Sequence, residues 1–133
     1  MKLEFIKDTA ILGHFSDEVN DQLIRLFDFD AAEAEKFCNS IQHVIINKNQ
    51  TLDLTSLDFI EAVNCNLVLQ LFDTNEGINT ADNINFTCDL TISEYKNIIK
   101  LCTPFCQNKS RGFAWMYDID TPIDFLFSPH GTW

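Results

Sequence analysis

Hydrophobic residues recur along the chain with two spacings, and the change from one to the other marks the expected elements. Leu3, Phe5 and Ile6 predict a short first strand. Ser16 then provides an N-cap, with Asp17 and Glu18 where the positive end of a helix dipole favours acids. An amphipathic helix is therefore expected over about 17–28. Its apolar stripe consists of Val19, Leu23, Leu26 and Phe27.

A second helix is predicted to begin at Asp30. Glu33 follows three residues later, and the pair has the spacing of a capping box. A long apolar stripe with helical spacing comes next, and the polar run 47–49 ends it. The residues of that stripe are Ala34, Phe37, Cys38, Ile41, Val44 and Ile45.

A third helix is expected after Ser93, which would act as its N-cap. Pro104 lies near its end and should kink or stop the helix, because proline lacks a backbone donor and crowds the preceding turn. The apolar residues of this helix are Tyr95, Ile98, Ile99, Cys102, Phe105 and Cys106.

Elsewhere apolar and polar residues alternate with the period of two that is typical of half-buried strands. The alternation predicts strands at 52–54, at 65–72 and at 85–91, with a polar stretch at 79–85. We expect the strands at 65–72 and 85–91 to pair antiparallel, with one face on the core and the other in water.

The last part of the chain predicts a hairpin. Residues 113–117 and 123–127 each alternate, and the five-residue turn 118–122 joins them. The expected order is then β-α-α-β-β-β-α-β-β. Grouped strands favour an α+β fold, a mainly antiparallel sheet with about three helices packed on it. Residues 1–133 are interpreted as a single α+β domain, a common size for one.

The net charge of the chain limits the classes of partner that it is expected to bind. Twenty acids against nine bases give a formal net charge of −11. This charge disfavours nucleic acid, which is bound through Lys and Arg, and it disfavours anionic membrane surfaces. A basic protein is the expected partner, although surplus acid also serves solubility alone. The N-terminal residues Met1–Asp8 do not form a signal-peptide apolar stretch, so a cytoplasmic location is predicted.

The sequence contains no motif that demands a cofactor or metal. Cys102 and Cys106 lie four residues apart on one helical face, but no second pair completes a tetrahedral zinc site. The odd cysteine count of five favours buried, reduced thiols. The run from Asp73 to Gly77 begins like a calcium loop and then loses its spacing. We predict no cofactor and no bound metal.

Aromatic residues gather near the end of the chain. In a regular hairpin Trp115 would share a face with Phe113 and Tyr117, either capping the core or forming a partner-binding surface. Aromatic and acidic residues together give a predicted binding set, with Asp118 and Asp120 in the turn of the hairpin. Its members are Asp17, Glu18, Asp21, Trp115, Tyr117, Asp118, Asp120 and Trp133.

Three functions remain open from the sequence. The first is a non-catalytic, acidic protein-binding domain, for which immunity-type inhibitors of basic toxins are the physical analogue. The second is a homodimeric structural subunit. The third is a small enzyme with scattered site residues near the C-terminal hairpin, for which the candidates are carboxylates, His130 and Cys88. Asp124, Ser128 and His130 only imitate a catalytic triad by their closeness in the sequence.

Overall fold

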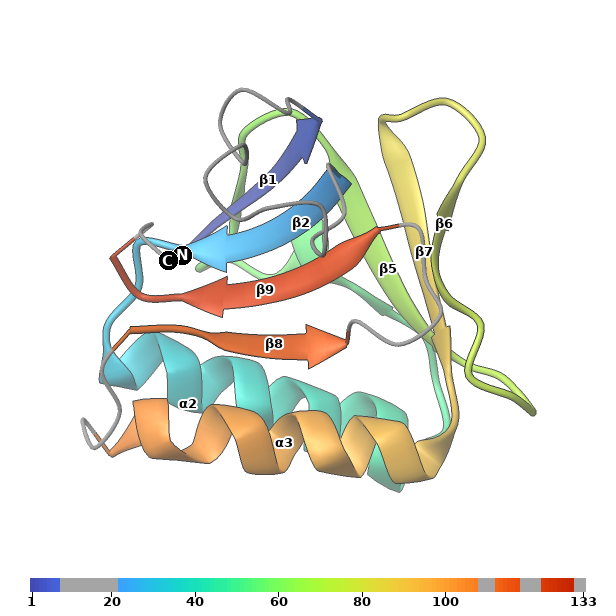
Figure 1. Ribbon diagram of the computed structural model, residues 1–133. Helices are drawn as coiled ribbons and strands as arrows, with labels where there is room; N and C mark the ends of the chain where they lie inside the picture. The colour runs from blue at the N-terminus through green and yellow to red at the C-terminus, as the bar shows by residue number, and fades with distance from the viewer. Residues whose placement is uncertain (8–21, 108–111, 118–122, 131–133) are drawn as a thin grey trace.

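The computed structural model describes residues 1–7, 22–107, 112–117 and 123–130. These residues form a mixed α+β fold in which two helices and two sheets enclose a shared core (Figure 1). The α+β class predicted from the sequence is confirmed. Across the described ranges, two mixed sheets take the place of the single, mainly antiparallel sheet, and two helices are found where about three were expected.

The first sheet has five strands in the order β4-β1-β2-β9-β8. Strand β2 lies at its centre, antiparallel to β1 and parallel to β9, and β8 and β9 form the predicted C-terminal hairpin. The bounds are β1 Lys2–Lys7, β2 Gln22–Phe27, β4 Glu61–Ala62, β8 Ala114–Tyr117 and β9 Asp124–Ser128.

The second sheet has four strands in the order β3-β5-β7-β6. Strands β5 and β7 lie at its centre and run parallel, while β3 and β6 pair antiparallel at the two edges. The bounds are β3 Leu52–Asp53, β5 Asn66–Leu71, β6 Gly77–Thr80 and β7 Asn85–Leu90.

Two helical segments lie side by side along one side of the molecule and run in opposite directions (Figure 1). Helix α2, Ala31–Ser40, begins with the predicted capping box, in which Asp30 accepts from the Glu33 amide at 2.9 Å. It continues as a π-helical segment, η2 (Ile41–Asn47), which keeps Ile41 and Ile45 buried. Helix α3 spans Ile92–Cys106.

The core lies where the two sheets and the helices meet. Phe5 of the first sheet and Phe86 of the second have ring centroids 4.7 Å apart. Phe127 of β9 packs against Phe37 of α2 at 5.5 Å and against Phe105 of α3 at 5.2 Å. The two sheets and the helices therefore bury apolar surface against one another. Burial of apolar surface is the dominant source of stability in such a domain.

The helix predicted over 17–28 is wrong where the structure describes it, because residues 22–27 form strand β2. Leu23, Ile24 and Leu26 are all buried, since this central strand is covered on both faces. Burial on both faces erases the alternation that identifies a strand, and the remaining apolar spacing resembles a helix. Residues 17–21 lie outside the described ranges.

The predicted antiparallel pairing of 65–72 with 85–91 is also wrong, because β5 and β7 are parallel. The polar stretch expected at 79–85 hides the cause. Strand β6 begins just before this stretch and pairs antiparallel with β7. The chain therefore reverses direction twice between β5 and β7. Two strands separated by one reversal run in opposite directions, and a second reversal makes them parallel.

The third helix begins earlier than expected. Thr91, and not Ser93, is the N-cap, and its side chain accepts from the Glu94 amide at 3.3 Å. Pro104 is held within the helix, which ends two residues later at Cys106. None of the helices in the described ranges is long and apolar enough to cross a membrane.

Candidate partner-binding surface

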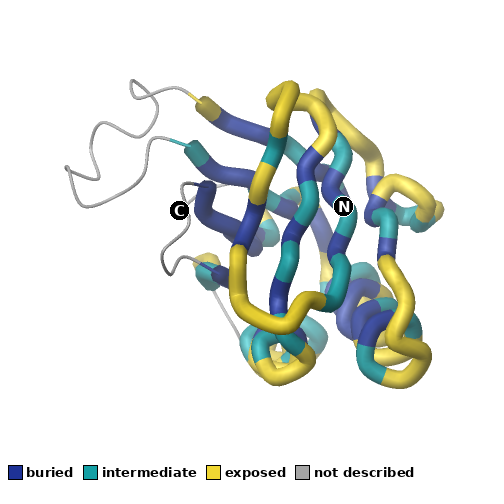
Figure 2. Tube along the Cα trace, turned by 90° about the vertical axis from the view of Figure 1, so that its right-hand side faces the viewer, coloured by how far each residue is buried: buried dark blue, intermediate teal, exposed yellow. Residues whose placement is uncertain are grey.

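The outer side of the second sheet is polar and partly open to solvent. Along β5 and β7 the core side is buried, while Val68, Gln70, Thr87 and Asp89 on the other side are only half-buried. Figure 2 looks onto this sheet and shows exposed turns at the ends of its strands. We call the outer side of β3, β5, β7 and β6, together with the turns 72–76 and 81–85, the acidic sheet face.

The charge of this region is one-sided. Residues 49–95, which contain the whole second sheet, include no lysine, arginine or histidine. The same stretch contains eight carboxylates: Asp53, Asp58, Glu61, Asp73, Glu76, Asp82, Asp89 and Glu94. Nothing within the stretch neutralises them, so a negative potential is expected over this side of the molecule.

Several of these carboxylates are held in position by neighbours. Gln70 on β5 donates through its side-chain nitrogen to Asp89 on β7 at 2.5 Å, a cross-strand pair on the outer side. Asp53 at the end of β3 accepts from the backbone and the hydroxyl of Thr55, at 3.1 and 2.9 Å. Fixed carboxylates lose little conformational freedom when they meet a cation.

Asp82 organises the turn between β6 and β7. Its carboxylate accepts from the Asn85 amide at 2.8 Å and from the Ile84 amide at 3.0 Å. These backbone donors lower the pKa of Asp82 to about 2, because hydrogen bonds to the charged form favour it. The turn therefore carries a full negative charge at neutral pH, next to the exposed side chain of Ile84.

An apolar hollow lies at the other end of the sheet. Leu71, Phe72, Asp73, Thr91 and Ile92 line a cavity of about 420 Å³. Phe72 is 50% exposed and Ile92 is 38% exposed, so two large side chains are open to solvent beside a carboxylate. Apolar side chains with an acidic neighbour suit the aliphatic stem and charged head of a lysine or arginine.

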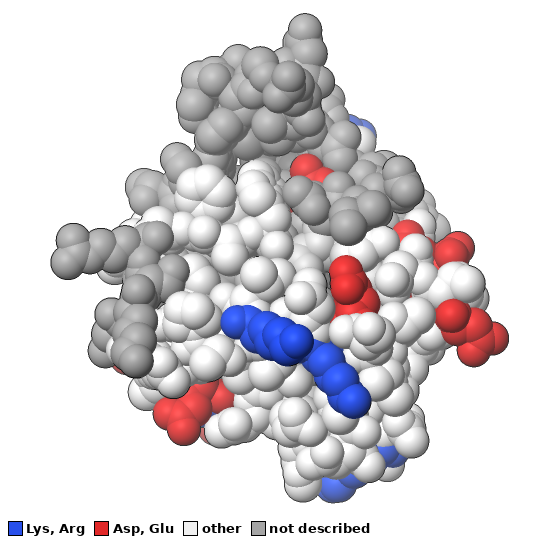
Figure 3. Space-filling model, turned by 60° about the horizontal axis from the view of Figure 1, so that its bottom comes forward, with Lys and Arg blue, Asp and Glu red and all other residues white. Residues whose placement is uncertain are grey.

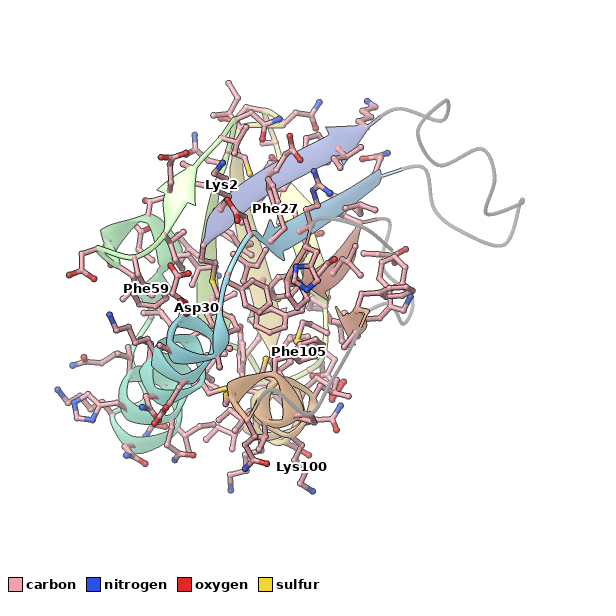
Figure 4. All side chains as sticks on the ribbon, turned by 90° about the vertical axis from the view of Figure 1, so that its left-hand side faces the viewer. Lys2, Phe27, Asp30, Phe59, Lys100 and Phe105 are labelled. Carbon is pink, nitrogen blue, oxygen red and sulfur yellow. The ribbon has the colours of Figure 1, made fainter. Side chains whose placement is uncertain are left out.

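Three of the seven lysines and arginines that the structure describes lie on helices α2 and α3. Lys96 and Lys100 of α3 and Lys36 of α2 are all exposed. Figure 3 brings the helix side forward and shows lysine or arginine side chains extending across it. Lys100 points away from both sheets (Figure 4). The helices and the first sheet thus carry cations, whereas the strands of the second sheet carry none.

The aromatic part of the predicted binding set divides between two faces. Trp115 is half-buried on the outer side of the first sheet, where it packs with Ile6, Leu23 and Leu126. Tyr117 is 5% exposed and belongs to the main core, with its hydroxyl 3.4 Å from the Asn75 carbonyl oxygen. The pairing with β9 is irregular between these residues, so they do not share a face as a regular hairpin predicts.

The other predicted binding residues fall outside the described ranges. They are Asp17, Glu18, Asp21, Asp118, Asp120 and Trp133. Of the predicted set, the structure describes only Trp115 and Tyr117, and it places these two on different faces of the first sheet.

The residues of the enzyme hypothesis are not assembled into one site. Cys88 is fully buried on the core side of β7. Asp124 and Ser128 stand at opposite ends of β9, about 13 Å apart at the rise of an extended strand. His130 is exposed beyond that strand.

The incomplete calcium-like run serves as a turn between β5 and β6. Asn75 accepts from the Thr91 amide at 2.9 Å, and Thr74 donates to Glu76 at 2.7 Å. Within the ranges described, no set of three or more His, Cys, Asp or Glu residues is arranged to hold a metal ion.

Sequence reasoning missed the acidic sheet face although its signal was present. The acids of residues 49–95 are widely spaced, so they do not stand out as a cluster in the sequence. The informative signal in residues 49–95 is the absence of lysine, arginine and histidine, and not the number of acids. Comparisons with known proteins add no relative: no protein-family model, no curated protein and no solved structure matches the chain.

Proposed function

We propose that this protein is a non-catalytic binding domain that recognises a basic protein through the acidic sheet face. The observation that carries the proposal is the absence of any base from residues 49–95, which supply all four strands of the second sheet. Such a surface attracts a cationic partner from a distance and repels phosphate backbones and anionic lipid. Immunity-type inhibitors of basic toxins remain the physical analogue.

A folded protein suits this surface better than a small cation. Asp53, Asp82 and Asp89 are separated along the sheet, and each already accepts a hydrogen bond from its own surroundings. A metal ion requires several ligands around one point. A basic protein can instead place several lysines or arginines opposite separate carboxylates and bury Phe72 and Ile84 at the same time.

A different partner is favoured over a second copy of the chain. In a symmetric dimer the same patch meets itself. Two acidic sheet faces would then bring Asp73, Glu76 and Asp89 against their own equivalents, and like charges brought together cost several kcal/mol. The homodimer therefore ranks second, and light scattering over a concentration range tests it directly.

The experiment compares two variants with the same change in charge. Asp73→Lys/Glu76→Lys/Asp89→Asn alters the acidic sheet face, and asparagine keeps an acceptor for Gln70. Glu35→Lys/Asp58→Lys/Glu61→Gln is the matched control: its residues are exposed and none belongs to that face, although Asp58 and Glu61 fall within the base-free run 49–95. Both variants reverse two acids and neutralise a third.

The binding partners to test are the purified basic proteins encoded by the flanking genes, titrated by calorimetry at low and high salt. We expect one of them to bind, with an affinity that falls as salt rises. The first variant should weaken binding about 100-fold, which is about 3 kcal/mol, and the control less than about threefold. Equal losses in both variants, or binding indifferent to salt, would refute the proposal.

A probe of known composition tests the surface without a partner. In a titration with a hexalysine peptide, followed by amide NMR shifts, residues of β5, β7 and the turn 72–76 should move. The amide shifts of residues along the exposed side of α3 should not change, because Lys96 and Lys100 repel the peptide. Shifts centred on α3 would contradict the proposed location.

A further inference from the structure

Four sulfur atoms gather where the two helices meet the first sheet. The thiol of Cys106, at the end of α3, lies 3.6 Å from the sulfur of Cys38 on α2. Cys102, one turn before Cys106, has its sulfur 3.4 Å from the thioether of Met116 on β8. Sulfur atoms are visible where α2 and α3 meet in Figure 4.

We propose that Cys38 and Cys106 are a reversible redox pair, which a hydroperoxide oxidises to a disulfide that joins the two helices. The geometry requires a small movement. The two sulfurs are 3.6 Å apart, and a disulfide bond is about 2.0 Å long. Cys106 is the last residue of α3, so its backbone is not held within a continuing helix. The neighbouring Cys102 also lies beside Cys38, but it is fully buried and its backbone is held one turn inside the helix.

The two thiols differ in a way that assigns their roles. Hydrogen bonds from the thiols of Cys102 and Cys106 stabilise a Cys38 thiolate and lower its pKa, against the opposing effects of burial and of Glu35. Burial raises the pKa of Cys106 to about 12, and nearby Cys38 adds to the rise. Cys38 is therefore the nucleophile, and Cys106 is the thiol that resolves the product.

The chemistry balances in two steps. The Cys38 thiolate attacks one peroxide oxygen, the O–O bond breaks, and a sulfenic acid forms while hydroxide or alkoxide leaves and takes a proton from water. Cys106 sulfur then attacks the Cys38 sulfur, and the displaced hydroxyl leaves as water with the Cys106 proton. Two thiols lose two electrons in total, and the peroxide gains them. A small thiol reverses the process by disulfide exchange.

Access fits this order of events. Cys38 is only 7% exposed, so the proposed oxidant is one as small as hydrogen peroxide. Cys106 is partly exposed. Cys65 and Cys88 are buried elsewhere, and burial raises the pKa of each to about 12. Those two thiols have neither a stabilised thiolate nor a neighbouring thiol hydrogen bond, so they serve as internal controls.

The test begins with hydrogen peroxide and the unaltered protein. All five cysteines are free in the structure. Oxidation of the pair should leave three titratable thiols in denaturant, and dithiothreitol should restore all five. Fragmentation of the linked peptides should place the bond between Cys38 and Cys106. A bond to Cys102, a bond between two chains, or five surviving thiols would overturn the proposal.

Two single variants separate the roles. Cys106→Ser should accumulate a Cys38 sulfenic acid that dimedone traps once per chain, while Cys38→Ser should keep all four of its thiols under the same treatment. Cys65→Ser is the matched control and should lose two thiols, as the unaltered protein does. Equal oxidation of Cys38→Ser and Cys65→Ser would refute the assignment. The peptide map of the unaltered protein decides the matter if a variant does not fold.

A thermal measurement gives an independent readout. The bond would link positions 68 residues apart, so it should restrict the unfolded chain and raise the melting temperature by several degrees. Reduction should return the melting temperature to its starting value. An unchanged or lower melting temperature after quantitative cross-linking would show that the bond distorts the helix pair, contrary to the small movement proposed.

Discussion

The two sheets of this protein use their outer sides differently. On the first sheet, β9 is buried at every position, and its outer residue Leu126 packs with Ile6, Leu23 and Trp115. Arg25 and Glu4 form an ion pair of 2.7 Å on that same side. The outer side of the second sheet instead presents half-buried Val68, Thr87 and Asp89. The first sheet is enclosed around β9 and the apolar neighbours of Leu126, whereas the central strands of the second sheet present a half-buried outer surface.

The difference explains how one chain can be both stable and strongly charged. The first sheet and the helices hold the large aromatic contacts, including Phe29 against Phe127 at 4.3 Å. The second sheet contributes to the core through one side only, so its other side is free to vary in sequence without a loss of packing. The comparison predicts that equivalent substitutions will affect stability on the first sheet and recognition on the second.

The largest expected effect comes from the centre of the aromatic cluster. Phe127→Ala should lower the free energy of unfolding by about 3–5 kcal/mol, because the ring is fully buried between Phe29, Phe37 and Phe105. Urea unfolding followed by circular dichroism measures the loss. A cost below about 1 kcal/mol would show that the cluster is not the main support of the fold.

A matched pair of truncations tests the two outer sides directly. Leu126→Ala on the first sheet should cost about 2–4 kcal/mol, since Leu126 is fully buried, whereas half-buried Val68→Ala on the second should cost less than about 1 kcal/mol. Both are measured by urea unfolding under the same conditions. Equal losses would break the distinction between an enclosed sheet and a presenting sheet.

Alkaline pH should destabilise the inner side of the second sheet. Burial raises the pKa of Cys88 to about 12 from its ordinary value of 9.0, so the unfolded chain releases this proton first. Stability is therefore complete below pH 9 and falls as pH rises toward 12, by roughly 2–3 kcal/mol for this group by pH 11. Urea midpoints across that range measure the slope, which Cys88→Ala should reduce. An unaltered slope in the variant would contradict the assignment.

Tyr95 joins α3 to the second sheet, and its loss should have a smaller effect. Its hydroxyl lies 2.6 Å from the Cys88 carbonyl oxygen and 3.0 Å from that of Gln70. Tyr95→Phe removes this donor and should cost about 1–2 kcal/mol in urea unfolding. The ring remains in the core, so the slope of the unfolding free energy against urea concentration should not change. An unchanged free energy of unfolding would show that α3 is held on the second sheet without this hydrogen bond.

The smallest effect is expected on the helix side. Lys96→Glu/Lys100→Glu adds negative charge away from the acidic sheet face and should alter unfolding by less than about 0.5 kcal/mol. Binding of the basic partner should change less than threefold, in contrast to the sheet variant. A large loss of binding in this variant would show that the recognition surface lies on the helices and not on the acidic sheet face.

The sequence alone determined the elements whose hydrophobic pattern is governed by near neighbours. The capping box of Asp30 and Glu33, the apolar stripe of α2, the strand at 85–90 and the C-terminal hairpin all follow from local spacing. Local hydrogen bonds and one-sided burial leave a period that can be read directly. The net charge and the base-free run of 49–95 are likewise properties of the sequence.

Only the tertiary structure decided which strands are neighbours and which sides are covered. Strand β2 looks helical because both of its faces are buried by elements distant in the chain. The parallel pairing of β5 and β7 depends on β6, whose short sequence gives no strong signal. The acidic sheet face and the Cys38–Cys106 pair likewise depend on long-range contacts, because only folding brings residues far apart in the sequence onto one surface.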